Sequence, residues 1–129
     1  MRKLLLVFIV VTTSLFAATN WAEDYKSAIK EAKAQKKKVL VYFTKEDCVK
    51  CNEMQWTLNS DDNVSQYINA HFIAVEIDLD YDRRQGFKVY SAPTIYFVNF
   101  NEKQIGDPVI GAQGPKSFLL KLQEVQKAK

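Results

Sequence analysis

Residues 39–51 read VLVYFTKEDCVKC and contain an apolar run, a charged turn and both cysteines of the chain. The run over 39–44 is aliphatic, β-branched or aromatic without polar alternation, which is typical of a strand covered on both faces of a parallel or mixed sheet. After the charged residues 45–47, we expect a helix that begins at or near Cys48 and reaches about Leu58. Cys48 and Cys51 are three positions apart, so this helix places both sulfurs on one face, within bonding reach.

Helix and strand patterns continue on both sides of this stretch. Upstream, helical spacing predicts an amphipathic helix over 21–35 whose buried face consists of Trp21, Tyr25, Ala28, Ile29 and Ala32. Downstream, the sequence predicts a short helix capped at 59–61 and strands over 72–80 and 94–100. A turn at 101–103 then leads into a returning strand that ends near Ile110. Pro115 opens a final helix, whose expected buried stripe is Phe118, Leu119, Leu122 and Val125. The order α, β, α, α, β, β, β, α predicts one α/β domain.

The first 18 residues differ from the rest of the chain. Arg2 and Lys3 precede an apolar run over 4–11, and the small residues Ala17 and Ala18 follow, which is the layout of a secretory signal peptide. Even counted over 4–18, the apolar stretch is shorter than the roughly 20 residues that a membrane-spanning helix needs. We therefore expect cleavage near Ala17 or Ala18, export, and a single domain over 19–129.

Composition limits the class of protein further. The chain has 129 residues, of which 47% are apolar and 12% aromatic, enough for the core of one domain. The net charge of +3 falls to +1 without Arg2 and Lys3, because 16 basic residues then face 15 acidic ones. Nucleic-acid binding needs a clustered positive field, and the basic run over 36–38 is interpreted as a solvated loop. We therefore expect no nucleic-acid partner.

The cysteine pair admits several interpretations, which the neighbouring residues separate. A structural disulfide stabilises a protein mainly by closing a long loop of the unfolded chain. A loop with two residues between the cysteines closes almost nothing, so this interpretation is not favoured. Structural zinc needs four ligands, whereas the chain offers one pair and His71, which is interpreted as an ordinary surface residue. Covalent haem attachment needs a histidine after the second cysteine, where Asn52 stands. A reactive pair is the interpretation favoured, since a helix N-terminus at Cys48 favours the nucleophilic thiolate.

The sequence resembles the thioredoxin superfamily over nearly all of the expected mature chain. The resemblance is carried by VLVYFT before CVKC, by AVEIDLD over 74–80, and by SAPTIYFV over 91–98, which contains Pro93. It is greatest with exported thioredoxin-like proteins related to the C-terminal domain of the transmembrane disulfide reductase. The resemblance implies a three-layer fold with a central mixed sheet of about four strands flanked by helices. It also implies a cis Pro93 that faces the cysteines, with the backbone of Ala92 available to pair with an extended substrate.

The sequence also departs from thioredoxin near the cysteines. Tyr42 stands where thioredoxins carry a buried aspartate that helps deprotonate the second cysteine, and tyrosine is a poor base at neutral pH. Glu76 is a candidate substitute, although a solvated acid is the interpretation favoured for it. Lys50 between the cysteines favours a Cys48 thiolate, whereas the acidic residues at 46 and 47 oppose it, so the redox direction is undecided from these charges.

Together these features predict thiol–disulfide exchange in the periplasm. Cys48 is expected to attack a substrate disulfide and Cys51 to resolve the mixed disulfide. The resemblance favours net reduction of disulfides in exported proteins, with a membrane thiol:disulfide electron donor, no metal or organic cofactor, and a monomeric protein. An oxidase or isomerase stays open as an alternative, as does a non-catalytic binding module with a permanently bonded pair.

Overall fold

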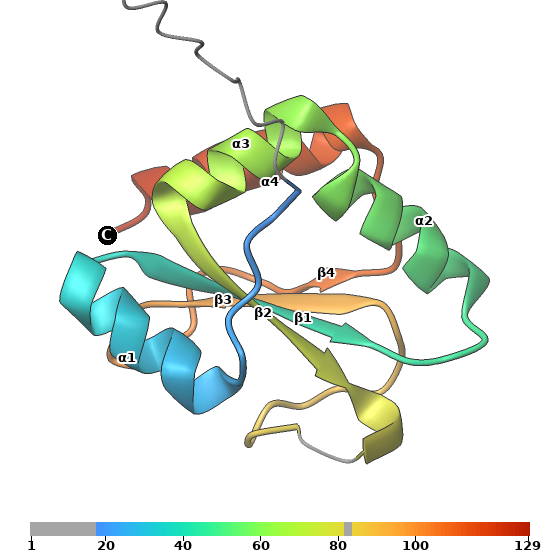
Figure 1. Cartoon of the computed structure of the whole chain (residues 1–129), viewed down its shortest axis with the longest axis horizontal. Helices are drawn as coiled ribbons and strands as arrows, with labels where there is room; N and C mark the ends of the chain where they lie inside the picture. Colours follow the sequence, from blue (N-terminus) through green and yellow to red (C-terminus); the bar gives the residue numbers. More distant parts are fainter. Residues whose placement is uncertain (1–17, 82–83) are drawn as a thin grey trace, which may run out of the picture.

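The computed structural model describes residues 18–81 and 84–129. The signal peptide expected over 1–18 therefore lies, apart from Ala18, outside the described residues. A four-stranded sheet forms the middle layer, with α1 below it and α2, α3 and α4 above it in the view of Figure 1. In chain order the elements are α1 (Tyr25–Gln35), β1 (Lys38–Thr44), α2 (Val49–Asn59), α3 (Asp62–His71), β2 (Phe72–Asp78), the 3₁₀ turn η1 (Leu79–Tyr81), β3 (Thr94–Val98), β4 (Val109–Ile110) and α4 (Pro115–Lys127).

The sheet has the strand order β2-β1-β3-β4. β1 is parallel to β2, antiparallel to β3, and β3 is antiparallel to β4. The predicted α/β class, the element order and the mixed sheet of about four strands are confirmed. β1 is a central strand, and its carboxyl end leads into α2. The residues that follow β1 therefore lie at the end of the sheet where β1 finishes.

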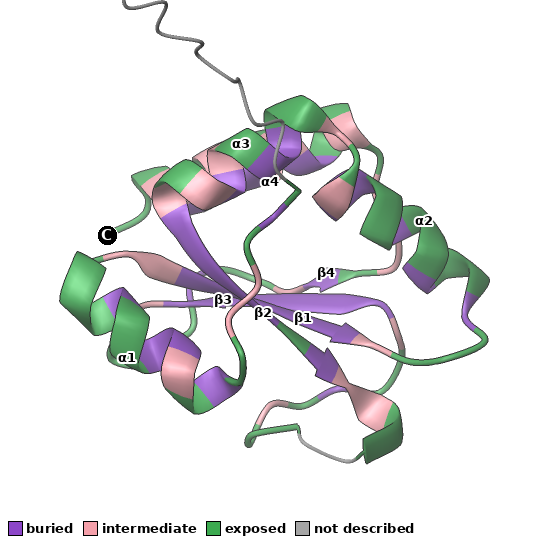
Figure 2. Ribbon diagram, viewed as in Figure 1, coloured by how far each residue is buried: buried purple, intermediate pink, exposed green. Residues whose placement is uncertain are grey.

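β1 is buried on both faces, as its lack of polar alternation predicted (Figure 2). Leu40 and Tyr42 belong to a core shared with α2, α3 and α4, which contains Met54, Leu58, Val64, Ile68, Phe118, Leu122 and Val125. Val39, Val41 and Phe43 belong to the opposite core, with Tyr25, Ala28, Ile29 and Ala32 of α1. The strand that precedes the cysteine pair is therefore fixed from both sides.

The first helix begins later than expected. Asp24 caps α1 by accepting the backbone N–H of Ser27 at 2.7 Å, which is the role of a short polar residue at a helix N-terminus. The prediction that Trp21 lies on the buried face of this helix is wrong. Trp21 forms a parallel bridge to Ala74 of β2, and its ring lies 5.9 Å from that of Tyr42, on the opposite side of the sheet from α1.

Three other boundaries differ from the prediction. β2 ends at Asp78 and continues as η1, and both of its faces are buried at its start because Phe72 and Ala74 join the core under α3. β3 ends at Val98, and the Asn99 side chain accepts N–H bonds at 2.9 Å and 3.0 Å in the turn that follows. β4 ends at Ile110, as predicted, but is shorter than expected, with two residues. On α4, Leu119 is partly buried rather than a full member of the buried stripe. Among the described residues, no helix is long and apolar enough to cross a membrane.

Candidate active site

Cys48 and Cys51 lie at the start of α2, as predicted, and form a disulfide. Cys48 is the N-cap residue, and its Sγ accepts the backbone N–H of Cys51 at 3.1 Å. The amide groups of the first turn and the positive end of the helix dipole therefore face this sulfur. Cys48 is 9% exposed and Cys51 is 1% exposed. Both cysteines are therefore buried, but Cys48, the outer cysteine, keeps some exposed surface whereas Cys51 is almost fully enclosed.

A short turn aims Cys48 at the helix start. Asp47 has a left-handed backbone conformation with φ 50°, which aspartate tolerates better than most residues. The N–H of Glu46 donates to Oδ2 of Asp80 at 2.9 Å, and the N–H of Asp80 donates in turn to Oδ1 of Asp78 at 2.9 Å. The end of β2 therefore holds the loop that presents Cys48. Asp80 in this role was missed at the sequence level, where it counted only as a polar position on a strand.

The loop before β3 lies against the outer cysteine. The peptide bond between Ala92 and Pro93 is cis, and the carbonyl oxygen of Ala92 lies 3.7 Å from Sγ of Cys48. Oγ1 of Thr94 donates to the carbonyl of Ser91 at 2.8 Å, and the N–H of Gly111 donates to the carbonyl of Pro93 at 2.9 Å. The structure therefore brings together all four residues named from the sequence, Cys48, Cys51, Ala92 and Pro93, from two segments 41 residues apart in the chain.

Tyr42 supports the helix from below. Its side chain is fully buried, and its hydroxyl donates to the carbonyl oxygen of Cys51 at 3.1 Å and lies 3.3 Å from Oγ1 of Thr44. Burial raises the pKa of Tyr42, a bond to Thr44 opposes this, and the carboxylate of Glu76 adds to the rise. A tyrosine whose pKa is raised stays protonated at neutral pH, so Tyr42 acts here as a donor and not as a base.

Glu76 lies beside Tyr42 in the parallel register of β1 and β2. Nε2 of Gln55 donates to its carboxylate at 3.5 Å, and Gln55 is one helical turn after Cys51 on the same side of α2. Although the residue is exposed overall, desolvation of the carboxyl raises the pKa of Glu76, and the charge of Asp78 raises it further. Gln55 was missed at the sequence level, although its spacing of four from Cys51 places it on the cysteine face.

Other charges at the site are solvated. Nζ of Lys50 lies 3.3 Å from the Glu53 carboxylate, and the two side chains are 67% and 53% exposed.

His71 ends α3 and contacts Tyr67, with 4.4 Å between ring centroids. Within residues 18–81 and 84–129, no cluster of three or more histidine, cysteine or acidic side chains is arranged to hold a metal ion.

Comparisons with known proteins agree with this geometry. The model of the thioredoxin-like domain family matches residues 25–126. A thioredoxin from Thermus thermophilus has a TM-score of 0.72 at 26% identity, covering 84% of this chain and 87% of that one. The DsbH oxidoreductase has a TM-score of 0.70 at 22% identity, covering 92% of each chain.

The C-terminal domain of DsbD from Neisseria meningitidis has a TM-score of 0.62 at 18% identity, covering 77% of this chain and 90% of that one. At this identity the likeness to DsbH and to DsbD shows a shared fold alone. A search of curated protein sequences finds no match. The disulfide pair at the start of α2, in a thioredoxin fold, supports thiol–disulfide redox chemistry. Since the family model spans most of the described residues, the chain belongs to the thioredoxin-like domain family.

Proposed function

We propose that this protein is a periplasmic thiol:disulfide oxidoreductase that reduces disulfides in exported proteins. The observation that carries the proposal is the inequality of the two cysteines: Cys48 caps α2 and is 9% exposed, whereas Cys51, bonded to it, is 1% exposed. An attacking sulfur has to reach a macromolecular disulfide, whereas a resolving sulfur has to reach only the first sulfur. The structure supports giving these two roles to Cys48 and Cys51 respectively.

The reaction begins with the reduced pair. The Cys48 thiolate attacks one sulfur of the substrate disulfide, so that a Cys48–substrate disulfide forms, the substrate S–S bond breaks and the departing sulfur takes up a proton. Cys51 then loses its proton and attacks Sγ of Cys48, which releases the second substrate thiol and forms the Cys48–Cys51 disulfide. Two electrons pass from the cysteine pair to the substrate. Sulfur performs the chemistry, so the proposal includes no metal or organic cofactor.

The segment before β3 is proposed to position the substrate. The backbone of Ala92 lies beside Cys48, and the pyrrolidine ring of Pro93 carries no N–H that would compete for the same space. An extended substrate strand passing over Cys48 would pair with the backbone of Ala92, in the manner of strand addition to a sheet edge.

The location and the electron donor are parts of the same proposal. The leader over 1–18 has the layout of a secretory signal peptide, which supports export to the periplasm. An exported reductase needs electrons from the cytoplasmic side, so we propose that a membrane thiol:disulfide reductase is the electron donor. We also propose that this protein acts as a monomer. No nucleic-acid partner is proposed.

Trapping with Cys51→Ala tests the proposal. Without the resolving sulfur, Cys48 should keep substrates as mixed disulfides that survive non-reducing electrophoresis, and the matched Cys48→Ala variant should trap none. Thiol labelling of the wild-type protein in cells should find the pair largely reduced. A pair found oxidised, together with trapped partners that hold free thiols, would favour an oxidase or isomerase. A pair that is permanently bonded and traps nothing would favour a binding module.

A further inference from the structure

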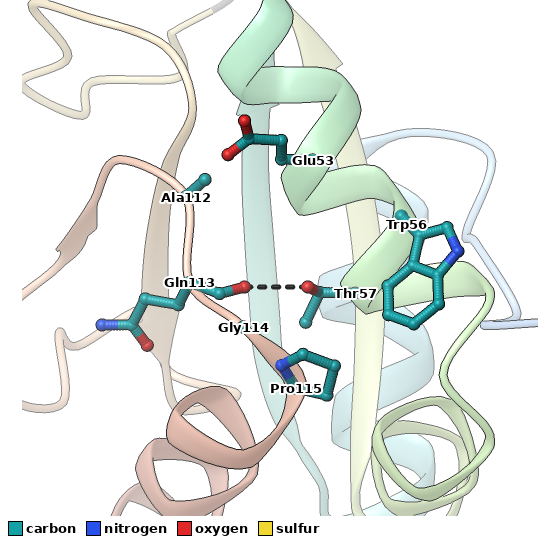
Figure 3. A pocket seen from close by; sticks show the side chains of 7 residues that line it. All are labelled: Glu53, Trp56, Thr57, Ala112, Gln113, Gly114 and Pro115. Atoms are coloured by element: carbon teal, nitrogen blue, oxygen red, sulfur yellow. Dashed lines mark hydrogen bonds between the residues drawn. The ribbon is translucent and has the colours of Figure 1, made fainter.

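A groove lies beside α2, on the side that faces the start of α4 (Figure 3). One wall consists of Trp56 and Thr57, and the opposite wall of Ala112 and Pro115, with Glu53 at the end nearer the cysteines. Its volume is about 350 Å³, at the lower end of the range of small ligand sites. Trp56 is 55% exposed, so a large apolar side chain is left facing solvent in this wall.

The walls of the groove are bound to each other. Oγ1 of Thr57 donates to the carbonyl of Gln113 at 2.8 Å, a bond drawn in Figure 3, and the N–H of Gln113 points to Sδ of Met54 at 3.4 Å. Both contacts join α2 to the segment before α4. The groove is therefore preformed, and an occupant would not have to order its walls, which lowers the entropic cost of binding.

The groove is linked to the cysteine site through α2, which carries both, and through the segment that forms its second wall. Gly111 precedes the groove residue Ala112, and its N–H donates to the carbonyl of Pro93 at 2.9 Å. Ile110, which pairs with Thr94, is 69% exposed, and Val49 between the cysteines is 73% exposed. Exposed apolar side chains therefore occur next to the outer cysteine, at Val49, beside the second wall of the groove, at Ile110, and in the groove itself, at Trp56.

We infer that the groove beside Trp56 is a specificity pocket that receives an apolar side chain of the substrate polypeptide, near the cysteine that Cys48 attacks. The inference rests on the proposed function and adds the substrate class to it. Glu53 and Trp56 lie five and eight residues after Cys48, which is about 7–12 Å along a helix. An extended strand covers that distance in about two to four residues. The preferred substrate therefore has a leucine or phenylalanine two to four residues from its reacting cysteine.

Peptides that carry one cysteine bonded to 2-nitro-5-thiobenzoate test the inference. Attack of reduced Cys48 on the peptide sulfur breaks the mixed disulfide and releases the coloured thiolate, while the peptide stays on Cys48 until Cys51 displaces it. The series places leucine, or serine as the reference, at each position from two to four on either side of the cysteine. We expect the wild-type protein to react about tenfold faster with leucine than with serine at one or more of these positions, as apolar pockets discriminate on this scale.

Trp56→Ser should bring the ratio of the leucine and serine rates to about one. The control is Leu120→Ser, which removes an apolar side chain of 63% exposure from α4 outside the groove and should leave the ratio as in the wild type. A wild-type ratio near one at every position would overturn the inference, and so would a preference that persists in Trp56→Ser or disappears equally in Leu120→Ser. The proposed function fails separately, if the reduced wild-type protein releases no thiolate from any peptide.

Discussion

The hydroxyl of Tyr42 provides the sharpest test of how the site is built. Tyr42→Phe removes one oxygen from a fully buried side chain and deletes its 3.1 Å bond to the Cys51 carbonyl. That carbonyl is in the first turn of α2, where the helical pattern supplies a second partner, the N–H of Gln55. The carbonyl therefore stays bonded, and the loss should be close to the net value of one hydrogen bond, about 1 kcal/mol, rather than the larger cost of an orphaned buried group.

Urea unfolding followed by circular dichroism measures this loss in the oxidised and the reduced protein. Since the bond involves no sulfur, we expect the same decrease of about 1 kcal/mol in both states, and a thermal midpoint lower by roughly 4–6 °C for a domain of this size. Tyr96→Phe is the control, because its hydroxyl donates at 2.6 Å to the Lys88 carbonyl away from the cysteines. The reasoning is refuted if Tyr42→Phe leaves stability unchanged, or if it alters the pH profile of disulfide reduction, which would make Tyr42 a proton donor or base.

Three further predictions follow from single contacts. Asp24→Ala removes the cap of α1 and should lower the free energy of unfolding by about 1 kcal/mol, measured by urea titration. Glu76→Gln should raise stability at neutral pH, because a raised pKa means that the charged form is penalised in the folded state; this gain should disappear as the pH falls below the ordinary glutamate pKa of about 4.3. In single-turnover kinetics the same variant should slow release of the mixed disulfide at neutral pH, and unchanged rates would remove Glu76 from the mechanism. Gly111→Ala places a side chain at φ 89° and should lower the thermal midpoint measured by circular dichroism.

The sequence predicts the elements whose signals are local and strong. The run before Cys48 is apolar without alternation because β1 is buried on both faces, and Cys48 begins α2 because its sulfur caps the helix. Trp21 is the instructive failure. Its spacing of four from Tyr25 fits a helical face, yet α1 begins only after its N-cap residue Asp24, and the indole packs on the other side of the sheet. Periodicity alone cannot distinguish a residue on a helix from one that precedes it at the same spacing.

The site was predicted to the extent that its residues are adjacent in sequence or carried by the resemblance. Cys48 and Cys51 follow from their spacing, and Ala92 and Pro93 from the family pattern. The groove beside Trp56 was not predicted, because its second wall is contributed by residues 112–115, more than 50 positions later in the chain. No local sequence pattern indicates that residues 112–115 lie against α2. Asp80 and Gln55 were missed for the same reason, since their partners lie on other elements.

The charges around the cysteine pair are compatible with the proposed reductive direction of exchange. Lys50 is paired with Glu53, and an exposed pair of this kind contributes 0–1 kcal/mol. The carboxylate of Glu53 therefore offsets part of the positive charge that Lys50 offers to a Cys48 thiolate. Glu76 acts in the opposite sense, because its carboxylate is bonded to Gln55, one turn from Cys51, in a partly desolvated position. A negative charge there raises the free energy of the ionised, reduced pair and leaves the disulfide unaffected. In the proposed reductase, such a charge would make the reduced pair the better electron donor.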